Sequence, residues 1–464
     1  MSETARPTPG RRASARRERR IDVLVGLAVL LPAVVSVSLA VIGEEENPLA
    51  DQRLPTTSPL TSATVVCPSG VAAGGVVRVA RVPGVPGGEL NVGDDTITVE
   101  DGGSSVTVPA TEGPVVLDGR GRAAPGIAAG REDRLAVPEC RAPSYDEWLV
   151  GVGASARYAT TIELVNPDGG DAVVDLALHG EDGPVEEPAL RGIEVPAHGV
   201  RQIDLAKAAP RAEVVSAHLV VVRGRVTATA RNTWDPLGRG RVTTDFLPAD
   251  TAPSTSSLLL GLPDQASATT LYLTNPGEDE VRVTPRLVSA EAVFNPTGVD
   301  EVAVPPGAMV PVDLTEVLQG EVADGVLGLQ IDATGPVVSS VMALVRDDLV
   351  LLAPAPDLRE PAAAVVPAGA KTLLLGGAQR TGVVHVTSYD ARGRTLADKQ
   401  VEVGAGRAAT LALPAAAVAV VVEARNTRIR AVVSLPVTGR QPGLATLRVR
   451  PAELRAQIPV VTPE

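Results

Sequence analysis

The segment Leu164-Val165-Asn166-Pro167-Asp168-Gly169 recurs in altered form as Leu273-Thr274-Asn275-Pro276-Gly277. Each copy is followed by a Val-Pro step and then by an Asp-Leu step. The prolines of these steps are Pro196 and Pro305, and the aspartates are Asp204 and Asp313. The two asparagines, the two prolines and the two aspartates are each 109 positions apart. This common spacing predicts an internal repeat, and the repeat decides the fold.

Short Val-rich runs alternate along the repeat with turns rich in Gly, Pro, Asn and Asp. Such runs are typical of strands, and a unit of about 100 residues with several of them is typical of an immunoglobulin-like β-sandwich. Late in each copy two apolar runs flank a short turn, as Leu219–Val222 and Val226–Thr229 do in the first, and we expect a hairpin there. Antibody domains have a Cys…Trp…Cys core that this chain lacks, so only the architecture is predicted.

A third, degenerate copy follows, in which Val401–Gly406 resembles the Val-Pro step but the Asn-Pro turn and the Asp are lost. The predicted fold class is therefore all-β, with tandem immunoglobulin-like β-sandwich domains after one N-terminal transmembrane helix. We expect the domains to follow one another like beads on a string. In chain order, the predicted parts are a basic cytoplasmic tail (1–20), a transmembrane signal-anchor (21–42), a Pro/Thr/Ser stalk (43–60), a β domain (61–142), repeat 1 (143–255), repeat 2 (256–360) and the degenerate repeat 3 (361–464).

The N-terminus has the pattern of a membrane anchor. Residues 1–20 carry seven Arg against two Glu, and the run Val23–Ile42 that follows has no charged residue. Twenty residues of helix span about 30 Å, which is enough to cross the hydrocarbon core of a bilayer. Basic residues before the span favour a cytoplasmic N-terminus, so we expect a single-pass protein of the plasma membrane with its C-terminal ectodomain extracytoplasmic. The alternative is a cleaved signal peptide and a secreted protein, with Ser38-Leu39-Ala40 as the best cleavage site.

Cys67 and Cys140 are the only cysteines of the chain, and both lie near a Pro. An isolated pair outside the cytoplasm is expected to form one disulfide, which would stabilise the fold by about 4 kcal/mol. A zinc site is the alternative, but the nearest histidine is His179 and no third and fourth ligand lie close by.

Composition excludes some function classes. The chain of 464 residues is 44% hydrophobic but only 2% aromatic, so a stacking platform for sugars or bases is disfavoured. The net charge is −13 although the tail is basic, so the remainder of the chain is acidic, and we expect no nucleic-acid partner.

The repeated polar residues have structural interpretations. Asp204 and Asp313 precede segments with the spacing of helix caps, and Asn166 and Asn275 are expected to bind backbone groups of their own turns. The acidic pairs near Asp94, Asp168 and Asp347 lack the spacing of known calcium loops, and the four scattered histidines are expected to be surface or strand residues. Gly151-Val152-Gly153 is read as a glycine-bearing turn. We expect no catalytic residues, no cofactor and no metal site.

Tyr145, Trp148 and Tyr158 form the only concentration of aromatic residues, close to Cys140 and at the start of the first repeat. One interpretation is a packing seam between domains. The other is a patch that binds a partner, because Trp and Tyr dominate the energetics of protein interfaces.

The arrangement resembles an actinobacterial family of uncharacterised proteins described as a domain of unknown function. The matching features are the basic N-terminus, one membrane segment, Cys67-Pro68, the stretch Trp148–Gly153, and the repeated Asn-Pro-Gly and Val-Pro steps. The resemblance implies a membrane-anchored or secreted protein in a cell-envelope setting, and it implies no activity.

The leading hypothesis is a non-enzymatic extracytoplasmic protein that serves as an interaction or scaffold module of the cell envelope. An envelope protein or an envelope glycan is its expected partner, beside the membrane itself through residues 21–42. The alternative is an accessory protein that binds or processes glycans. It would need exposed aromatic residues or a pair of carboxylates across a cleft, and the sequence offers little of either.

Overall fold

The computed structural model describes residues 27, 28, 30, 56–71, 75–100, 104–109, 112–132, 136–250, 252–320, 324–437 and 443–458. The chain divides into two units, one of Met1–Ser58 with Gln457–Glu464 and the other of Pro59–Ala456. Strands β1 (Thr56–Pro59) and β35 (Arg455–Ile458) pair as a two-stranded sheet.

Most of the predicted N-terminal parts lie outside the described residues. The basic tail and most of the stalk are among them, and so is the membrane segment 21–42 apart from Leu27, Ala28 and Leu30, which are helical. Within the described part of the chain no helix is long and apolar enough to cross a membrane.

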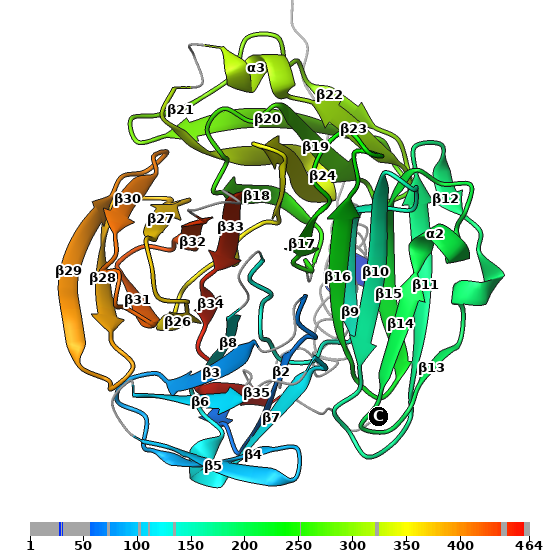
Figure 1. Cartoon of the computed structure of the whole chain (residues 1–464). Helices are drawn as coiled ribbons and strands as arrows, with labels where there is room; N and C mark the ends of the chain where they lie inside the picture. Colours follow the sequence, from blue (N-terminus) through cyan, green and yellow to red (C-terminus); the bar gives the residue numbers. More distant parts are fainter. Residues whose placement is uncertain are drawn as a thin grey trace, which may run out of the picture. The chain divides into compact units, whose positions relative to one another are not determined.

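The unit Pro59–Ala456 is built of β-sandwiches, so the all-β prediction is confirmed (Figure 1). The N-terminal sandwich has one sheet in the order β2-β7-β4-β5 and a second in the order β6-β3-β8. Its strands are β2 (Ser62–Cys67), β3 (Val76–Arg81), β4 (Gly88–Val92), β5 (Asp95–Val99), β6 (Ser105–Pro109), β7 (Val115–Arg120) and β8 (Ile127–Glu132).

Repeat 1 also has two sheets, which share one apolar core. One sheet runs β12-β11-β15-β9 with β13 beside β11, and the other runs β14-β10-β16-β17. The elements are β9 (Asp146–Gly153), β10 (Tyr158–Val165), β11 (Ala172–Gly180), β12 (Gly183–Val185), β13 (Ile193–Val195), β14 (Val200–Asp204), α2 (Leu205–Ala208), β15 (Val214–Arg223), β16 (Thr227–Trp234) and β17 (Thr243–Leu247).

Repeat 2 has the same connections. Strands β18, β20, β21 and β22 lie with the first half of β24, whereas β19, β23 and β25 lie with its second half. The elements are β18 (Ser254–Leu260), β19 (Ala268–Thr274), β20 (Val281–Ser289), β21 (Val293–Phe294), β22 (Val302–Val304), β23 (Met309–Asp313), α3 (Thr315–Gln319), β24 (Val326–Val345) and β25 (Asp348–Leu352).

Repeat 3 is degenerate in sequence and still has this topology, with sheets in the orders β29-β28-β31-β26-β34 and β30-β27-β32-β33. Its strands are β26 (Ala362–Val365), β27 (Thr372–Gly376), β28 (Gly382–Tyr389), β29 (Thr395–Val403), β30 (Ala409–Ala412), β31 (Ala419–Arg425), β32 (Arg430–Val437), β33 (Gly443–Arg448) and β34 (Arg450–Pro451). In each repeat we call the sheet with its first strand (β9, β18 or β26) the first-strand sheet. The sheet with its second strand (β10, β19 or β27) is the second-strand sheet.

The predicted hairpins are wrong. Strand β15 pairs with β9 and β11, whereas β16 pairs with β10 and β17, so the turn between them carries the chain from one sheet to the other. In repeat 2 the same crossing is made by a single strand, β24, which is 20 residues long. A turn between two apolar runs looks the same in a sequence whether the runs pair with each other or not.

The expected string of separate beads is also wrong, because neighbouring sandwiches contact one another within one compact unit. The first-strand sheet of repeat 1 packs on the second-strand sheet of repeat 2, where the Ser340 hydroxyl donates to the Val150 carbonyl at 2.6 Å. Repeat 2 meets repeat 3 in the same way, and the Ala408 amide donates to the Ser289 carbonyl at 2.9 Å.

The cycle of contacts closes through the N-terminal sandwich. A hydrogen bond of 3.2 Å from the Ser105 amide to the Ala391 carbonyl joins it to repeat 3. On its other side, the Ser69 amide donates to the Glu163 carboxylate of repeat 1 at 2.8 Å. The four sandwiches therefore contact one another head to tail.

Candidate functional site

The segment between β8 and β9 is tied to β2 at Cys140 and Arg141. The predicted disulfide is confirmed, because Cys140 is bonded to Cys67 at the end of β2. Next to it, Val66 and Arg141 exchange two backbone hydrogen bonds of 2.8 and 3.0 Å. These links fix the position of Glu139, which precedes Cys140 and is buried.

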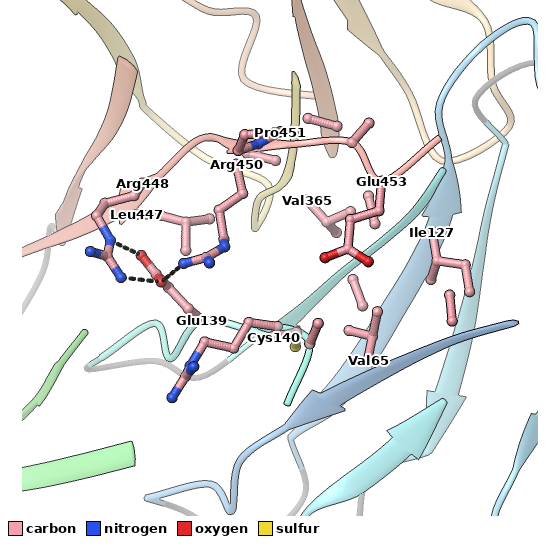
Figure 2. Close-up of a pocket in the computed structure, with 18 of the residues that line it drawn as sticks. Val65, Ile127, Glu139, Cys140, Val365, Leu447, Arg448, Arg450, Pro451 and Glu453 are labelled. Atoms are coloured by element: carbon pink, nitrogen blue, oxygen red, sulfur yellow. Dashed lines mark hydrogen bonds and ion pairs between the residues drawn. The ribbon is translucent and has the colours of Figure 1, made fainter. Parts of the chain in front are cut away.

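Glu139 accepts hydrogen bonds from two arginines of the C-terminal segment, as Figure 2 shows. Arg448 at the end of β33 donates two hydrogen bonds to the carboxylate, from Nε and Nη2, at 2.7 Å each. Arg450 of β34 adds a bond of 3.2 Å from Nη1. A bidentate arginine–carboxylate pair is among the strongest hydrogen-bonded contacts in proteins.

The guanidinium of Arg448 also binds groups other than Glu139. Its Nη1 donates to the Pro354 carbonyl, between repeats 2 and 3, and its Nη2 donates to the Ala249 carbonyl, after the last strand of repeat 1, at 2.9 Å each. One buried side chain of repeat 3 therefore contacts segments of the other three sandwiches. We call Glu139 with Arg448 and Arg450 the hub.

A second buried ion pair lies beside the hub. Arg141 donates to both carboxylate oxygens of Glu147 in β9 and to the carbonyl of Ala228 in β16, with 2.6 Å between Nη2 and Oε2. Glu147 is fully buried. Burying two charges is costly, and the cost is offset only when the remaining donors and acceptors are also bonded, as they are here.

The electrostatics of the hub favour a permanent ion pair over acid–base chemistry. Burial alone would raise the pKa of Glu139, but the charge and hydrogen bonds of Arg448, with the charges of Arg450 and Arg141, lower this pKa to about 2. A carboxyl group with such a pKa stays ionised and is a poor general acid at neutral pH. The adjoining cavity is about 70 Å³, far smaller than the several hundred Å³ that small-molecule sites usually have. The hub therefore joins domains through buried, ionised side chains.

Two buried aspartates link the last strands of the three repeats. Asp245 of β17 accepts a hydrogen bond of 2.8 Å from the Leu351 amide of β25. Asp348 of β25 accepts one of 3.0 Å from the Leu444 amide of β33. Burial raises the pKa of Asp245 well above its usual value, and Asp348 nearby raises it further, although the Leu351 and Phe246 amides lower it. These carboxylates again join neighbouring domains.

The aromatic residues near Cys140 do not form one exposed patch, so the patch of Tyr145, Trp148 and Tyr158 needs correction. Trp148 is 2% exposed and Tyr158 is 3% exposed, whereas Tyr145 is 63% exposed. Strand alternation turns Trp148 away from the core of repeat 1. There it belongs to an apolar cluster with Tyr272 and Met309 of repeat 2.

Two histidines that are far apart in the sequence pack against the ring of Trp148. The ring of His218 stacks on it with centroids 4.1 Å apart, and the ring of His179 lies 5.2 Å away. The Nδ1 atom of His179 is 2.8 Å from the carbonyl oxygen of Gly307 in repeat 2. Sequence reasoning missed this cluster because strand pairing, and not sequence distance, places the three rings on one sheet face.

The repeated asparagines bind their own turns, as predicted. The side-chain amide of Asn166 donates to the Gly170 carbonyl, and that of Asn275 donates to the Asp279 carbonyl. Each amide also reaches a strand 29 residues further along, at the carbonyl of Val195 in one repeat and of Val304 in the other. This second contact explains why the Asn-Pro and Val-Pro landmarks recur together.

The repeated aspartates accept hydrogen bonds from backbone amides at the start of short helices, but only Asp204 is the cap residue. Asp204 is the N-cap of α2, with its carboxylate 3.1 Å from the Ala206 amide. Asp313 accepts a hydrogen bond from the Thr315 amide at 2.9 Å. The N-cap residue of α3 is Leu314, so Asp313, which the sequence predicts as the cap, lies one position before it.

The acidic turn residues are engaged within the protein. Asp168 forms a pair of bonds to Arg225 at 2.8 and 2.9 Å, and Asp171 accepts from the Ala197 amide at 3.0 Å. Across the described ranges, no three His, Cys, Asp or Glu side chains converge as a metal-binding group. Gly151 lies inside strand β9 and not in a turn. Its φ is +73°, and a side chain there would collide with the ring of Tyr272.

Comparison with known proteins gives a family and no activity. Residues 97–414 match the model of a family described as a family of unknown function (DUF5719). The chain belongs to this family. The match begins in β5 and ends after β30, so it includes Glu139 and Trp148 but not Arg448. No curated protein and no solved structure matches the chain.

Proposed function

We propose that the protein is a non-enzymatic extracytoplasmic interaction or scaffold protein of the cell envelope. The observation that carries this proposal is the hub, where Arg448 contacts Glu139, Ala249 and Pro354. A buried clamp between four domains gives them fixed positions, and fixed positions suit a body that presents surfaces to partners. Sandwich loops and faces can bind without any chemistry.

The proposed location is the outer side of the plasma membrane, with residues 21–42 as the anchor. The apolar run without charges and the Cys67–Cys140 disulfide support it, because disulfides persist in oxidising compartments. Detection of residues 1–40 on the mature, membrane-bound protein would support the anchor. A mature protein that begins near Val41 would instead show secretion after signal cleavage.

We also propose that the repeats are immunoglobulin-like. With strands numbered within one repeat, the sheets run 4-3-6-1-9 and 5-2-7-8 in repeat 3. Leaving out strands 4, 5 and 9 gives the orders 3-6-1 and 2-7-8, which correspond to strands D-E-B and C-F-G of immunoglobulin domains. An experimental structure of the repeats with another strand order would contradict this assignment.

Photocrosslinking in cells tests the scaffold proposal. A crosslinking residue at exposed positions such as Tyr145 and Val222 should give discrete adducts with envelope components. A hub variant, Arg448→Met, should change the pattern at several positions at once, whereas Arg191→Gln on the exposed surface should leave it unchanged. Absence of any adduct, or turnover of purified envelope polysaccharide by the protein, would overturn the proposal.

A second candidate function is accessory glycan binding. It is favoured by a cleft of about 390 Å³ between repeats 2 and 3, which lies within the usual size range of ligand sites. Binding of purified envelope polysaccharide to the full-length protein, measured by co-sedimentation, tests this candidate, and the absence of binding contradicts it.

A further inference from the structure

The cleft between repeats 2 and 3 is lined by polar side chains of both domains. Strands β18 and β24 provide one wall, and the loops before β30 and β32 provide the other. The lining residues that matter here are Ser254, Ser256 and Gln330 of repeat 2, and Arg407, Arg428 and Arg430 of repeat 3. Three arginines therefore line the cleft, together with the acidic Asp357.

Two side chains differ between equivalent domain junctions, and in repeat 2 both of them line the cleft. In repeat 1 the outward row of the first-strand sheet places Trp148 opposite His218. In repeat 2 the corresponding row places Leu258 opposite Gln330. A leucine and a glutamine fill less of the junction than a tryptophan stacked on a histidine, and both Leu258 and Gln330 line the cleft.

Two of the three arginines carry charge that the rest of the cleft does not neutralise. Arg430 is committed, since it pairs with Asp357 at 2.9 Å and donates to the Ser256 carbonyl at 3.3 Å. Arg407 and Arg428 are exposed, and neither forms an ion pair with any carboxylate in the described parts of the chain. This basic cleft is unusual in a chain whose net charge is −13.

Arg407 is positioned by its own loop. A Cβ atom at Gly404 would lie 2.8 Å from Nε of Arg407, so the side chain runs close against the glycine backbone. This contact limits the conformations of a long side chain whose residue lines the cleft. A pre-positioned guanidinium loses less entropy when it binds an oxyanion.

We propose that this cleft binds an acidic glycan, with Arg407 and Arg428 holding its carboxylate or phosphate groups. A guanidinium matches the two oxygens of either group. The other polar lining groups are engaged within repeat 2, because the Ser254 hydroxyl donates to the Ser256 carbonyl and both the Ser256 hydroxyl and the Gln330 amide donate to Asp332. The two arginines therefore supply the recognition. None of the described lining residues is aromatic, so the stacking on which neutral sugars depend is missing. The inference rests on the second candidate function and names its ligand class.

The test is calorimetric titration of the full-length protein in detergent with three oligosaccharide probes. A galacturonate tetramer supplies carboxylates, a glycerol-phosphate tetramer supplies phosphates, and maltotetraose is neutral. The double variant Arg407→Gln/Arg428→Gln should bind the acidic probe at least tenfold more weakly than the wild type. The matched control Arg191→Gln, an exposed arginine of repeat 1, should bind as the wild type does. Binding should weaken with added salt, and maltotetraose should not bind.

The two acidic probes distinguish carboxylate from phosphate as the recognised group. Equal binding of an acidic probe by the wild type and the double variant would overturn the assignment to this cleft, although glycan binding itself would survive. Failure of both acidic probes to bind the wild type, or equal binding of maltotetraose, would overturn the acidic ligand class. Circular dichroism confirms that each variant is folded. The scaffold proposal is tested separately, by crosslinking, and does not depend on these results.

Discussion

The two junctions on either side of repeat 2 are built from equivalent sheets and are filled differently. Between repeats 1 and 2, Trp148 is 2% exposed, stacks on His218 and lies in a cluster with residues of repeat 2. Between repeats 2 and 3, Leu258 packs in a small apolar cluster beside an open, basic cleft. One junction is closed by an aromatic ring, and the other leaves a cleft of about 390 Å³.

This difference shows how a repeated domain can separate stability from binding. The two junctions share a backbone arrangement. The groups that fill each junction depend on a few outward-facing side chains. A buried tryptophan contributes a large apolar area to its junction. The junction without one has a smaller apolar contact and keeps room for polar groups, so it is the place where a site can arise at little cost in packing.

Trp148→Ala should have the largest effect on the closed junction. Removing a buried aromatic ring costs about 3–5 kcal/mol, because apolar area is lost and a cavity remains. Leu258→Ala should cost about 2 kcal/mol, at the low end for leucine, because water can enter from the adjoining cleft. The free energy of unfolding from urea titration measures both. Tyr145→Ala is the control, since an exposed ring should change stability by less than about 0.5 kcal/mol.

Equal losses in Trp148→Ala and Leu258→Ala would contradict the contrast between the junctions. A loss in Tyr145→Ala as large as that in Trp148→Ala would show that the unfolding measurement does not report on the junction.

Arg448→Met should weaken both junctions together. The change leaves the buried carboxylate of Glu139 without its main partner and releases the carbonyls of Ala249 and Pro354. Breaking one side of a buried pair costs about 3–5 kcal/mol. The double variant Arg448→Met/Glu139→Gln should recover part of this loss, as measured by urea unfolding. A double variant no better than the single one would show that the carboxylate is not the cause.

Lowering the pH should remove the contribution that ionised Glu139 makes to the free energy of unfolding. Its pKa is lowered from 4.5 to about 2, so the folded state binds fewer protons than the unfolded state between these values. The stabilisation is present above pH 4.5 and is lost as pH falls through about 2, and its size is on the order of 3 kcal/mol. Thermal melts over this range should show a steeper decline for the wild type than for Arg448→Met. Parallel declines would contradict the assignment to the hub.

The local features of the fold could be predicted from sequence, and the long-range ones could not. Val-rich runs and turns predict the strands, the 109-residue spacing predicts the repeats, and the two cysteines predict the disulfide. Asp204 and Asn166 bind groups within a few residues, so their roles follow from local patterns. Such contacts depend on neighbouring positions that a reader of the sequence can see.

The hub and the aromatic cluster could not be predicted because they depend on contacts between distant segments. Arg448 and Glu139 are separated by 309 positions, and nothing near either residue indicates the other. The partners of Trp148 depend on which strands pair. The same limit explains the wrong hairpin, since Leu219 and Ala228 belong to different sheets although a short turn separates their strands.

His179 should make the closed junction sensitive to pH. Burial lowers its pKa below 6.5, and the charge of His218 lowers it further, although the bond to Gly307 opposes this. The unfolded state therefore takes up a proton first as pH falls below 6.5, so stability is lost in that direction. His179→Gln keeps a donor for the Gly307 carbonyl and should flatten the pH dependence of the melting temperature. An unchanged slope would exclude His179 as the source.

The arginines of the cleft should matter least for stability, and this sharpens the contrast between the two junctions. Arg407 and Arg428 are exposed and unpaired with carboxylates in the described residues, so replacing either with Gln should change the free energy of unfolding by less than about 0.5 kcal/mol. Arg430→Gln should cost up to about 1 kcal/mol, because it breaks the pair with Asp357. Urea titration of the three variants measures this order. A neutral result leaves both arginines free to bind a ligand, whereas a large loss in Arg407→Gln or Arg428→Gln would make them part of the junction itself.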